Sequence, residues 1–199
     1  VHRAHAADPA FLDMCGACVR ELRSACAAAL SGPEFKVAPF EWTPDVRVEP
    51  FGSLVQGTLL RSSDVDARLS FAQFAARDRA QQLRYLQAIA DAPGPQFGDP
   101  HIVPGRLPVL RLRFRGRVDV DLTMGEDVED CSVVDKTIDT LLGELAHDVA
   151  RNFARLVKVL VKANGLVDAY QGYLNSVSWM VLAVHFLQSE GLLPHRTPP

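Results

Sequence analysis

Hydrophobic and polar positions divide the chain into helical and extended stretches. Apolar side chains recur at helical spacing from about residue 9 to residue 30, where Ser31-Gly32-Pro33 ends the pattern. The spacing is again helical from about residue 132, through "VDKTIDTLLGELAHDVARNFARLVKVLVKANGL" and "LNSVSWMVLAVHFLQSEGLL". A charged helix is expected over residues 72–91, and the stretch "DAPGPQFGDPHIVPG", dense in Pro and Gly, predicts a loop.

The middle of the chain alternates with the period of a β-strand. "DVRVEPF" leads into a Gly-Ser pair, and "DVDARLSF" places Asp64 and Asp66 on one face of a strand. "LPVLRLRF" and "RVDVDLTM" predict a hairpin with an Arg-Gly turn. In its second strand the valines share the buried face, so Asp119 and Asp121 share the other. Helix, strands and a helical block in this order predict an α+β catalytic layer followed by an α-helical domain.

Composition narrows the class of protein. The 199 residues are 48% hydrophobic, which is typical of a globular chain with one core or two small ones. No apolar run reaches about 18 residues, so neither a transmembrane helix nor a membrane partner is expected. The net charge of −3 excludes a globally basic surface. A nucleic acid would therefore need a local patch, for which the arginines of "RLRFRGR" are a candidate and a solvated hairpin face the alternative.

Four cysteines in a chain of this length favour a reducing, intracellular compartment. Cys15-Gly-Ala-Cys18 has the spacing of a zinc or redox half-site, but it lies inside the first helical pattern and no second pair follows. We interpret these cysteines as helix-packing residues. The first residue is Val and "VHRAHAADP" lacks the apolar core of a secretory signal, so we expect the chain to begin and end within a longer polypeptide.

The aspartates of the two Asp-Val-Asp segments are the candidate chemical groups. Side-by-side carboxylates repel unless a cation lies between them, and hard divalent cations such as Mg²⁺ take oxygen ligands. Two such ions about 3.5–4 Å apart can activate a 3′-hydroxyl and stabilise a departing pyrophosphate. The strand pattern supplies Asp64, Asp66 and one of Asp119 or Asp121. A solvated strand edge is the alternative interpretation.

Phe51-Gly-Ser, ten residues of spacer and Asp-Val-Asp together resemble the signature of the DNA polymerase β-type nucleotidyltransferases. Order and spacing are closest to the terminal uridylyltransferases and their poly(A)-adding relatives. "VPGRLPVLRLRFRGRVDVDLT" is similar to the family's hairpin with the third carboxylate, and "RLVKVLVKANGL" to its helix with two triphosphate-binding lysines. "GYLNSVSWMVLAVHFLQSEGLLP" resembles the family's Leu-x-Ser segment and the apolar helix after it.

The resemblance covers roughly residues 40–194 and implies a domain organisation. It implies a polymerase β-like nucleotidyltransferase palm, a mixed sheet with flanking helices, over residues 34–130. An α-helical domain of the poly(A) polymerase-associated type is then expected from residues 131–199 together with the N-terminal helix 8–31, incomplete at the C-terminus.

The resemblance also assigns site residues. Asp64 and Asp66 match the two-metal carboxylates, and Asp121 matches the third because Asp-Leu-Thr fits the family's Asp-Ile/Val-Ser, with Asp119 in reserve. The positions that match triphosphate-binding residues are Gly52, Ser53, Lys158, Lys162 and Ser176. Backbone N–H groups and a hydroxyl at the Gly-Ser pair can meet a triphosphate, and lysines four residues apart share a helix face.

Two nucleotide-binding positions depart from the family pattern. Val177 stands where a tyrosine usually stacks on the base, and Asp135 stands where an asparagine contacts the ribose. An aspartate can still accept a hydrogen bond from a ribose hydroxyl. Trp179, two residues beyond Val177, is interpreted as a core aromatic residue.

The activity that the resemblance implies is template-independent nucleotide addition to RNA 3′ ends. UTP is the expected nucleotide and ATP the alternative, with two Mg²⁺ or Mn²⁺ ions and a single-stranded RNA 3′ end as acceptor. A catalytically silent RNA-binding subunit of the same fold is a rival from another class. Protein partners in an RNA-processing complex and a mitochondrial or cytoplasmic location are further expectations.

Overall fold

The computed structural model describes residues 6–32, 35, 45–71, 79–105, 107–125, 128–167 and 172–195. They form two compact units, which we call the sheet unit and the helical unit. The sheet unit contains the described residues of Asp8–Phe51 and Ser63–Cys131, and the helical unit contains those of Val1–Ala7, Gly52–Ser62 and Ser132–Pro199. No helix among the described residues is long and apolar enough to cross a membrane.

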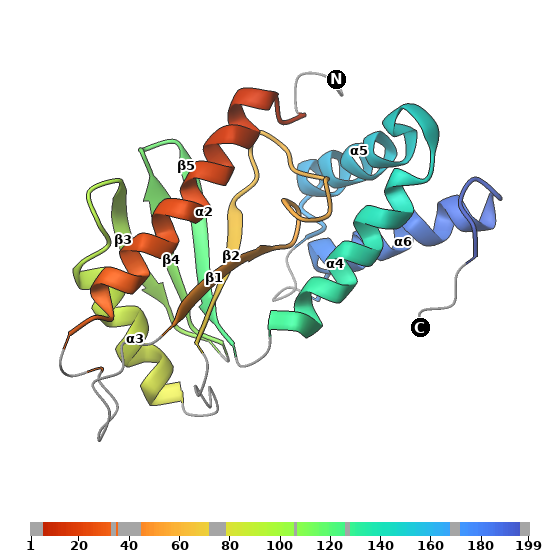
Figure 1. Cartoon of the computed structure of the whole chain (residues 1–199). Coiled ribbons are helices and arrows are strands. Elements are labelled where there is room, and N and C mark those ends of the chain that lie inside the picture. Colours follow the sequence, from red (N-terminus) through yellow and green to blue (C-terminus); the bar gives the residue numbers. More distant parts are fainter. Residues whose placement is uncertain are drawn as a thin grey trace. The chain divides into compact units, whose positions relative to one another are not determined.

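Five strands form the mixed sheet of the sheet unit. They are β1 (Val46–Phe51), β2 (Val65–Phe71), β3 (Phe97–Val103), β4 (Val109–Phe114) and β5 (Val118–Met124). Their order is β1-β2-β5-β4-β3, with β2 and β5 parallel and every other neighbouring pair antiparallel. Flanking helices complete the α+β fold that the sequence predicts (Figure 1).

Alternation along the strands separates an apolar face of the sheet from a polar one. In β5 the buried positions are Val118, Val120, Leu122 and Met124, while Asp119 is exposed and Asp121 half-buried. Helix α2 (Pro9–Ala29) packs against β1 and against α3 (Arg79–Asp91), which contacts β3 and β4. The aspartates are therefore carried on the face opposite the apolar side chains.

Helix α2 is confirmed as a helix, but it does not lie where the sequence had us expect. Its N-terminus is capped by Asp8, whose side chain accepts a hydrogen bond from the backbone N–H of Phe11 at 2.8 Å. The buried side chains of its inner face are Cys15, Cys18, Leu22 and Cys26, and α2 belongs to the sheet unit rather than to the C-terminal helices. An amphipathic pattern reveals that one face is buried, not which element buries it.

The expectation of a loop over "DAPGPQFGDPHIVPG" is wrong, because this stretch contains β3. Within the described ranges the strand pairs with β4 alone, at the edge of the sheet, and its register shifts between Gly98 and His101. Proline is tolerated in an edge strand because no neighbour there requires its missing N–H. Asp99 has a φ of 54° within the irregular segment. Residues 72–78 of the helix expected before it lie outside the described residues.

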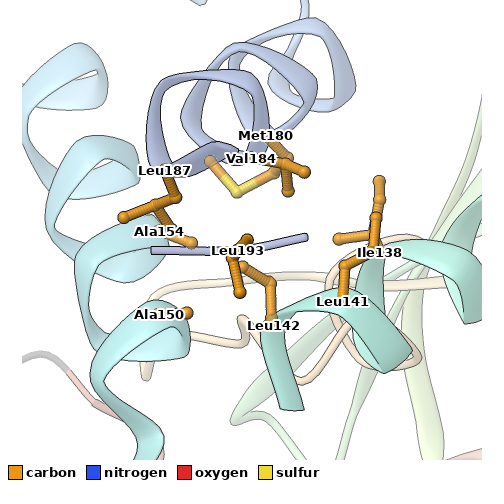
Figure 2. Close-up of a cluster of buried hydrophobic side chains, with 9 residues drawn as sticks. All are labelled: Ile138, Leu141, Leu142, Ala150, Ala154, Met180, Val184, Leu187 and Leu193. Carbon is orange, nitrogen blue, oxygen red and sulfur yellow. The ribbon is translucent and has the colours of Figure 1, made fainter. Parts of the chain in front are cut away.

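In the part of the chain that the structure describes, three α-helices and a short 3-10 helix build the helical unit. They are α4 (Val128–Gly143), η2 (Ala146–Asp148), α5 (Val149–Ala163) and α6 (Ser176–Ser189). Figure 2 shows their shared hydrophobic core, which consists of Ile138, Leu141, Leu142, Ala150, Ala154, Met180, Val184, Leu187 and Leu193. Trp179 packs against this cluster and donates its indole N–H to the carbonyl of Leu166 at 2.9 Å, so its interpretation as a core aromatic is confirmed.

Candidate functional site

Parallel pairing of β2 with β5 brings three carboxylates together in the sheet unit. Asp66 and Asp121 are partners in the register, and Asp64 lies two residues before Asp66 on the same side of the chain. One oxygen from each of these three half-buried side chains lies within 4.8 Å of the others. We call Asp64, Asp66 and Asp121 the carboxylate group. The sequence had left Asp119 as a reserve, and it is not part of this group.

Asp119 lies on the same face of β5 but has a different partner. Its carboxylate forms an ion pair with Arg113 of β4, at 2.8 Å between Nε and Oδ1, and its side chain is 63% exposed. Asp121 is only 20% exposed, and the Nε of Arg111 lies 3.2 Å from its Oδ1. The two aspartates of β5 therefore occupy unlike environments although they lie only two positions apart on the same face of the strand.

The electrostatics of Asp121 favour a bound cation. Burial raises the pKa of this carboxyl group, Arg111 opposes the rise, and the negative charge of Asp64 adds to it. The net direction is upward, so the ionised carboxylate is poorly stabilised by its surroundings. Three convergent carboxylate oxygens are the donor set that Mg²⁺ and Mn²⁺ take in proteins, and the residues present fit such an ion.

The Gly52–Ser62 loop leaves β1 with a turn that requires glycine. Gly52 has a φ of 67°, a conformation that side chains with a Cβ rarely adopt. Its N–H donates to Oδ2 of Asp135 at 2.5 Å, and the side-chain amide of Gln56 donates to Oδ1 at 2.6 Å. Two backbone bonds close the turn, from Gln56 N to Gly52 O and from Thr58 N to Ser53 O, both at 3.0 Å. The N–H of Gly52 thus binds Asp135 and is not the bare triphosphate donor that the sequence suggested.

Asp135 has a different environment from the one expected of a ribose-contacting residue. It is 4% exposed, and both carboxylate oxygens accept the hydrogen bonds from Gly52 and Gln56. A buried carboxylate with two such donors holds a loop in place. The sequence offered no signal for this arrangement, because Gly52 and Gln56 lie 83 and 79 residues from Asp135 along the chain.

The far side of the same turn is held by α5. Arg155 donates from Nη2 to the carbonyl of Gly57 at 2.7 Å. Gly57 has a φ of 67°, and a Cβ there would lie 2.9 Å from Nε of Arg151. Arg151 itself forms ion pairs with Asp139 at 2.8 Å and Asp148 at 3.1 Å. Sequence reasoning missed both arginines, because their helical neighbours give no sign of a loop packed beside them.

The two lysines of α5 differ in burial. Lys158 is 5% exposed and follows Ala150 and Ala154 along the buried face, whereas Lys162 is exposed in the last turn. Of these two lysines only Lys162 is exposed to solvent, although their four-residue spacing places both on one helix face.

Ser176 and Val177 open α6. Asn175 caps this helix by accepting from the backbone N–H of Ser178 at 2.9 Å, and the side chain of Val177 is 39% exposed. Ser53, at the other candidate phosphate contact, is 8% exposed. Every candidate nucleotide-binding residue lies in the helical unit, whereas the carboxylate group lies in the sheet unit.

Comparison with known proteins supports the α+β fold described above, a mixed sheet with flanking helices. Residues 35–129 match the family described as poly(A) RNA polymerase, mitochondrial-like, central palm domain. Among curated proteins no significant match is found.

Solved structures resemble almost the whole chain. mtPAP in complex with GTP has a TM-score of 0.75 at 16% identity, over 98% of this chain and 42% of its own. Terminal uridylyl transferase 4 from Trypanosoma brucei with bound UTP and UMP matches with a TM-score of 0.69 at 20% sequence identity. The match covers 92% of this chain and 56% of the transferase chain. The Cid1 poly(U) polymerase with bound Mg and 3′-dATP matches with a TM-score of 0.68 at 16% sequence identity. The match covers 94% of this chain and 52% of the polymerase chain. The chain therefore spans about half the length of the structures it matches.

Proposed function

We propose that this chain, which has the fold of the polymerase β-like nucleotidyltransferase superfamily, transfers nucleoside monophosphates from ribonucleoside triphosphates to RNA 3′ ends. The observation that supports the proposal most directly is the carboxylate group. Asp66 of β2, Asp121 of the parallel strand β5 and Asp64, directly before β2, converge within 4.8 Å at the positions where the family resemblance expects metal ligands. Convergent carboxylates repel one another, a divalent cation between them would relieve that repulsion, and phosphoryl transfer uses such an ion.

Asp64, Asp66 and Asp121 would hold Mg²⁺ or Mn²⁺, and two ions are the number that the resemblance implies. Bound ions of this kind stabilise the charge that develops on the attacking 3′-oxygen and on the leaving pyrophosphate. The protein's contribution would then be positional, because the adjacent backbones of β2 and β5 place Asp66 and Asp121 side by side in the register.

The helical unit would bind the triphosphate. Lys162 offers an exposed ammonium group, and the Ser53 and Ser176 hydroxyls are further candidate contacts. Lys158 is buried, so a contact between its ammonium group and the triphosphate would lie closer to the protein interior. Asp135 holds the Gly-Ser turn in place through the hydrogen bond that it accepts from the Gly52 N–H. Binding and orientation of the nucleotide, rather than covalent participation by the protein, then account for the rate.

UTP is our first candidate for the nucleotide, because the spacing of the Gly-Ser and Asp-Val-Asp motifs most resembles the uridylyltransferases. One observation favours ATP instead, namely the match of residues 35–129 to a family described as poly(A) polymerase-like. Protein partners in an RNA-processing complex, and a mitochondrial or cytoplasmic location, stay predictions.

The test is primer extension with a labelled single-stranded RNA, Mg²⁺ and each of the four nucleotides separately. The matched pair of variants is Asp66→Ala and Asp119→Ala, which remove carboxylates from the same sheet face, inside and outside the carboxylate group. We expect extension by the unmutated chain and by Asp119→Ala, and a loss of about 10³-fold or more in Asp66→Ala. If Asp66→Ala extends RNA as fast as the unmutated chain, the proposed site is wrong.

The nucleotide dependence separates the candidates. Faster extension with UTP supports a uridylyltransferase, and faster extension with ATP replaces it by an adenylyltransferase. RNA binding without extension by any nucleotide favours the silent-subunit interpretation, for which Val177 and the buried Asp135 are the supporting positions.

A further inference from the structure

Two cross-strand arginine–aspartate pairs lie side by side on the polar face of the β4–β5 hairpin. Arg111 is the register partner of Asp121, and Arg113 is the register partner of Asp119. Their Nε–Oδ1 distances are 3.2 Å and 2.8 Å. The pairs have the same residue types, the same strands and the same antiparallel geometry. They differ in the burial of the aspartate, and only Asp121 belongs to the carboxylate group.

Arg111 therefore contacts an oxygen of the residue that a divalent ion would need. Without an ion, the negative charges of Asp64 and Asp121 repel each other, and the guanidinium of Arg111 partly offsets that repulsion. The Arg111 side chain is 58% exposed, against 20% for Asp121. An exposed arginine whose one ion pair among the described residues is a surface contact can turn into solvent without disturbing the packing of the sheet.

We propose that Arg111 is an exchangeable counter-ion of the carboxylate group: it contacts Asp121 when no divalent ion is bound and leaves that oxygen when an ion binds. Displacement of the guanidinium is then part of metal binding, and Arg111 weakens the apparent affinity of the group for the ion. Arg113 has no such role, because its partner Asp119 lies outside the carboxylate group. The inference rests on the proposed function only in taking the carboxylate group as a metal site.

The experiment measures Mn²⁺ binding to the purified chain without nucleotide or RNA, by the loss of the free Mn²⁺ signal in electron paramagnetic resonance. The variants are Arg111→Gln, its matched control Arg113→Gln, and Asp121→Asn. We expect Arg111→Gln to lower the Kd for Mn²⁺ by about 3- to 5-fold, which corresponds to the loss of one competing exposed ion pair. Arg113→Gln should change the Kd by less than about 2-fold, and Asp121→Asn should raise it strongly.

Equal or weaker Mn²⁺ binding by Arg111→Gln would overturn the proposal, and so would an equal gain in Arg113→Gln, which would indicate a general effect of net charge. A site that is lost in Asp121→Asn but unchanged in Arg111→Gln refutes the counter-ion role and leaves the proposed function intact. No Mn²⁺ binding by the unmutated chain, measured up to millimolar Mn²⁺, overturns both. Both arginines are surface residues, so far-UV circular dichroism of each variant should match that of the unmutated chain.

Discussion

Replacing Asp135 with asparagine tests how far one buried carboxylate holds the Gly52–Ser62 loop. In the unmutated chain its two oxygens accept from the Gly52 N–H at 2.5 Å and from the Gln56 amide at 2.6 Å. An asparagine of nearly the same shape has a single acceptor oxygen. One of the two donors then keeps a weaker, neutral hydrogen bond, and the other faces an NH₂ group.

The expected loss of unfolding free energy follows from these two bonds. A hydrogen bond to a charged group contributes about 1.5–3 kcal/mol, and a buried donor without an acceptor costs about 1–3 kcal/mol. The amide avoids the cost of burying a charge, which offsets part of the loss. We therefore expect Asp135→Asn to lower the unfolding free energy by about 2–3 kcal/mol. With a urea m value of about 2 kcal/mol/M, the midpoint falls by about 1–1.5 M.

Tryptophan fluorescence during urea unfolding is the measurement. Trp179 packs against the core of the helical unit, and a Trp42→Phe background makes it the only tryptophan of the chain. The matched control is Asp91→Asn, where the carboxylate accepts from Gln87 at 2.8 Å but is exposed, so a change within about 0.5 kcal/mol is expected. A midpoint for Asp135→Asn that stays within about 0.3 M of the parent would refute the reasoning, because two buried charged bonds cannot be lost at so small a cost.

Three further substitutions or titrations follow from the described contacts. Gly57→Ala should destabilise the chain by about 1–3 kcal/mol more than Gly116→Ala, measured by urea unfolding: both have positive φ, but only at Gly57 would a Cβ meet Arg151. Equal losses would contradict the contact.

The three cysteines of α2 have pKa values raised by burial to about 11 or 12 from 9.0, so in a Cys131→Ser background they should react with a thiol reagent only as the protein unfolds. Because the folded pKa is the higher one, their contribution to stability is complete below pH 9.0 and is lost as pH rises above it, which urea midpoints on either side of that pH would detect. Lys162→Ala should raise KM for the nucleotide about tenfold without changing the unfolding midpoint, and an unchanged KM would remove Lys162 from the site.

Local patterns in the sequence predicted most strands, because period-two alternation is a property of neighbouring residues. They identified β1, β2 and the β4–β5 hairpin, and with the family resemblance they identified Asp64, Asp66 and Asp121 as a set that the structure brings together. β3 was missed because its Pro and Gly residues are typical of loops unless the strand is known to be at a sheet edge.

What the sequence could not supply are contacts that depend on the folded chain. The bond between Gly52 and Asp135 joins residues far apart in sequence, and no periodicity records it. For the same reason the spacing of Lys158 and Lys162 predicts a shared helix face but not their burial, which changes from one turn of α5 to the next.

The Gly52–Ser62 loop makes the two units interdependent as folding units. The chain leaves the sheet unit after Phe51, returns at Ser63 and leaves again after Cys131, so neither unit is one continuous segment. A fragment cut at residue 131 would keep this loop but lose Asp135 and Arg155, which hold its two sides. A fragment that ends near residue 130 would therefore carry the Gly52–Ser62 loop without the side chains that hold the loop in this conformation.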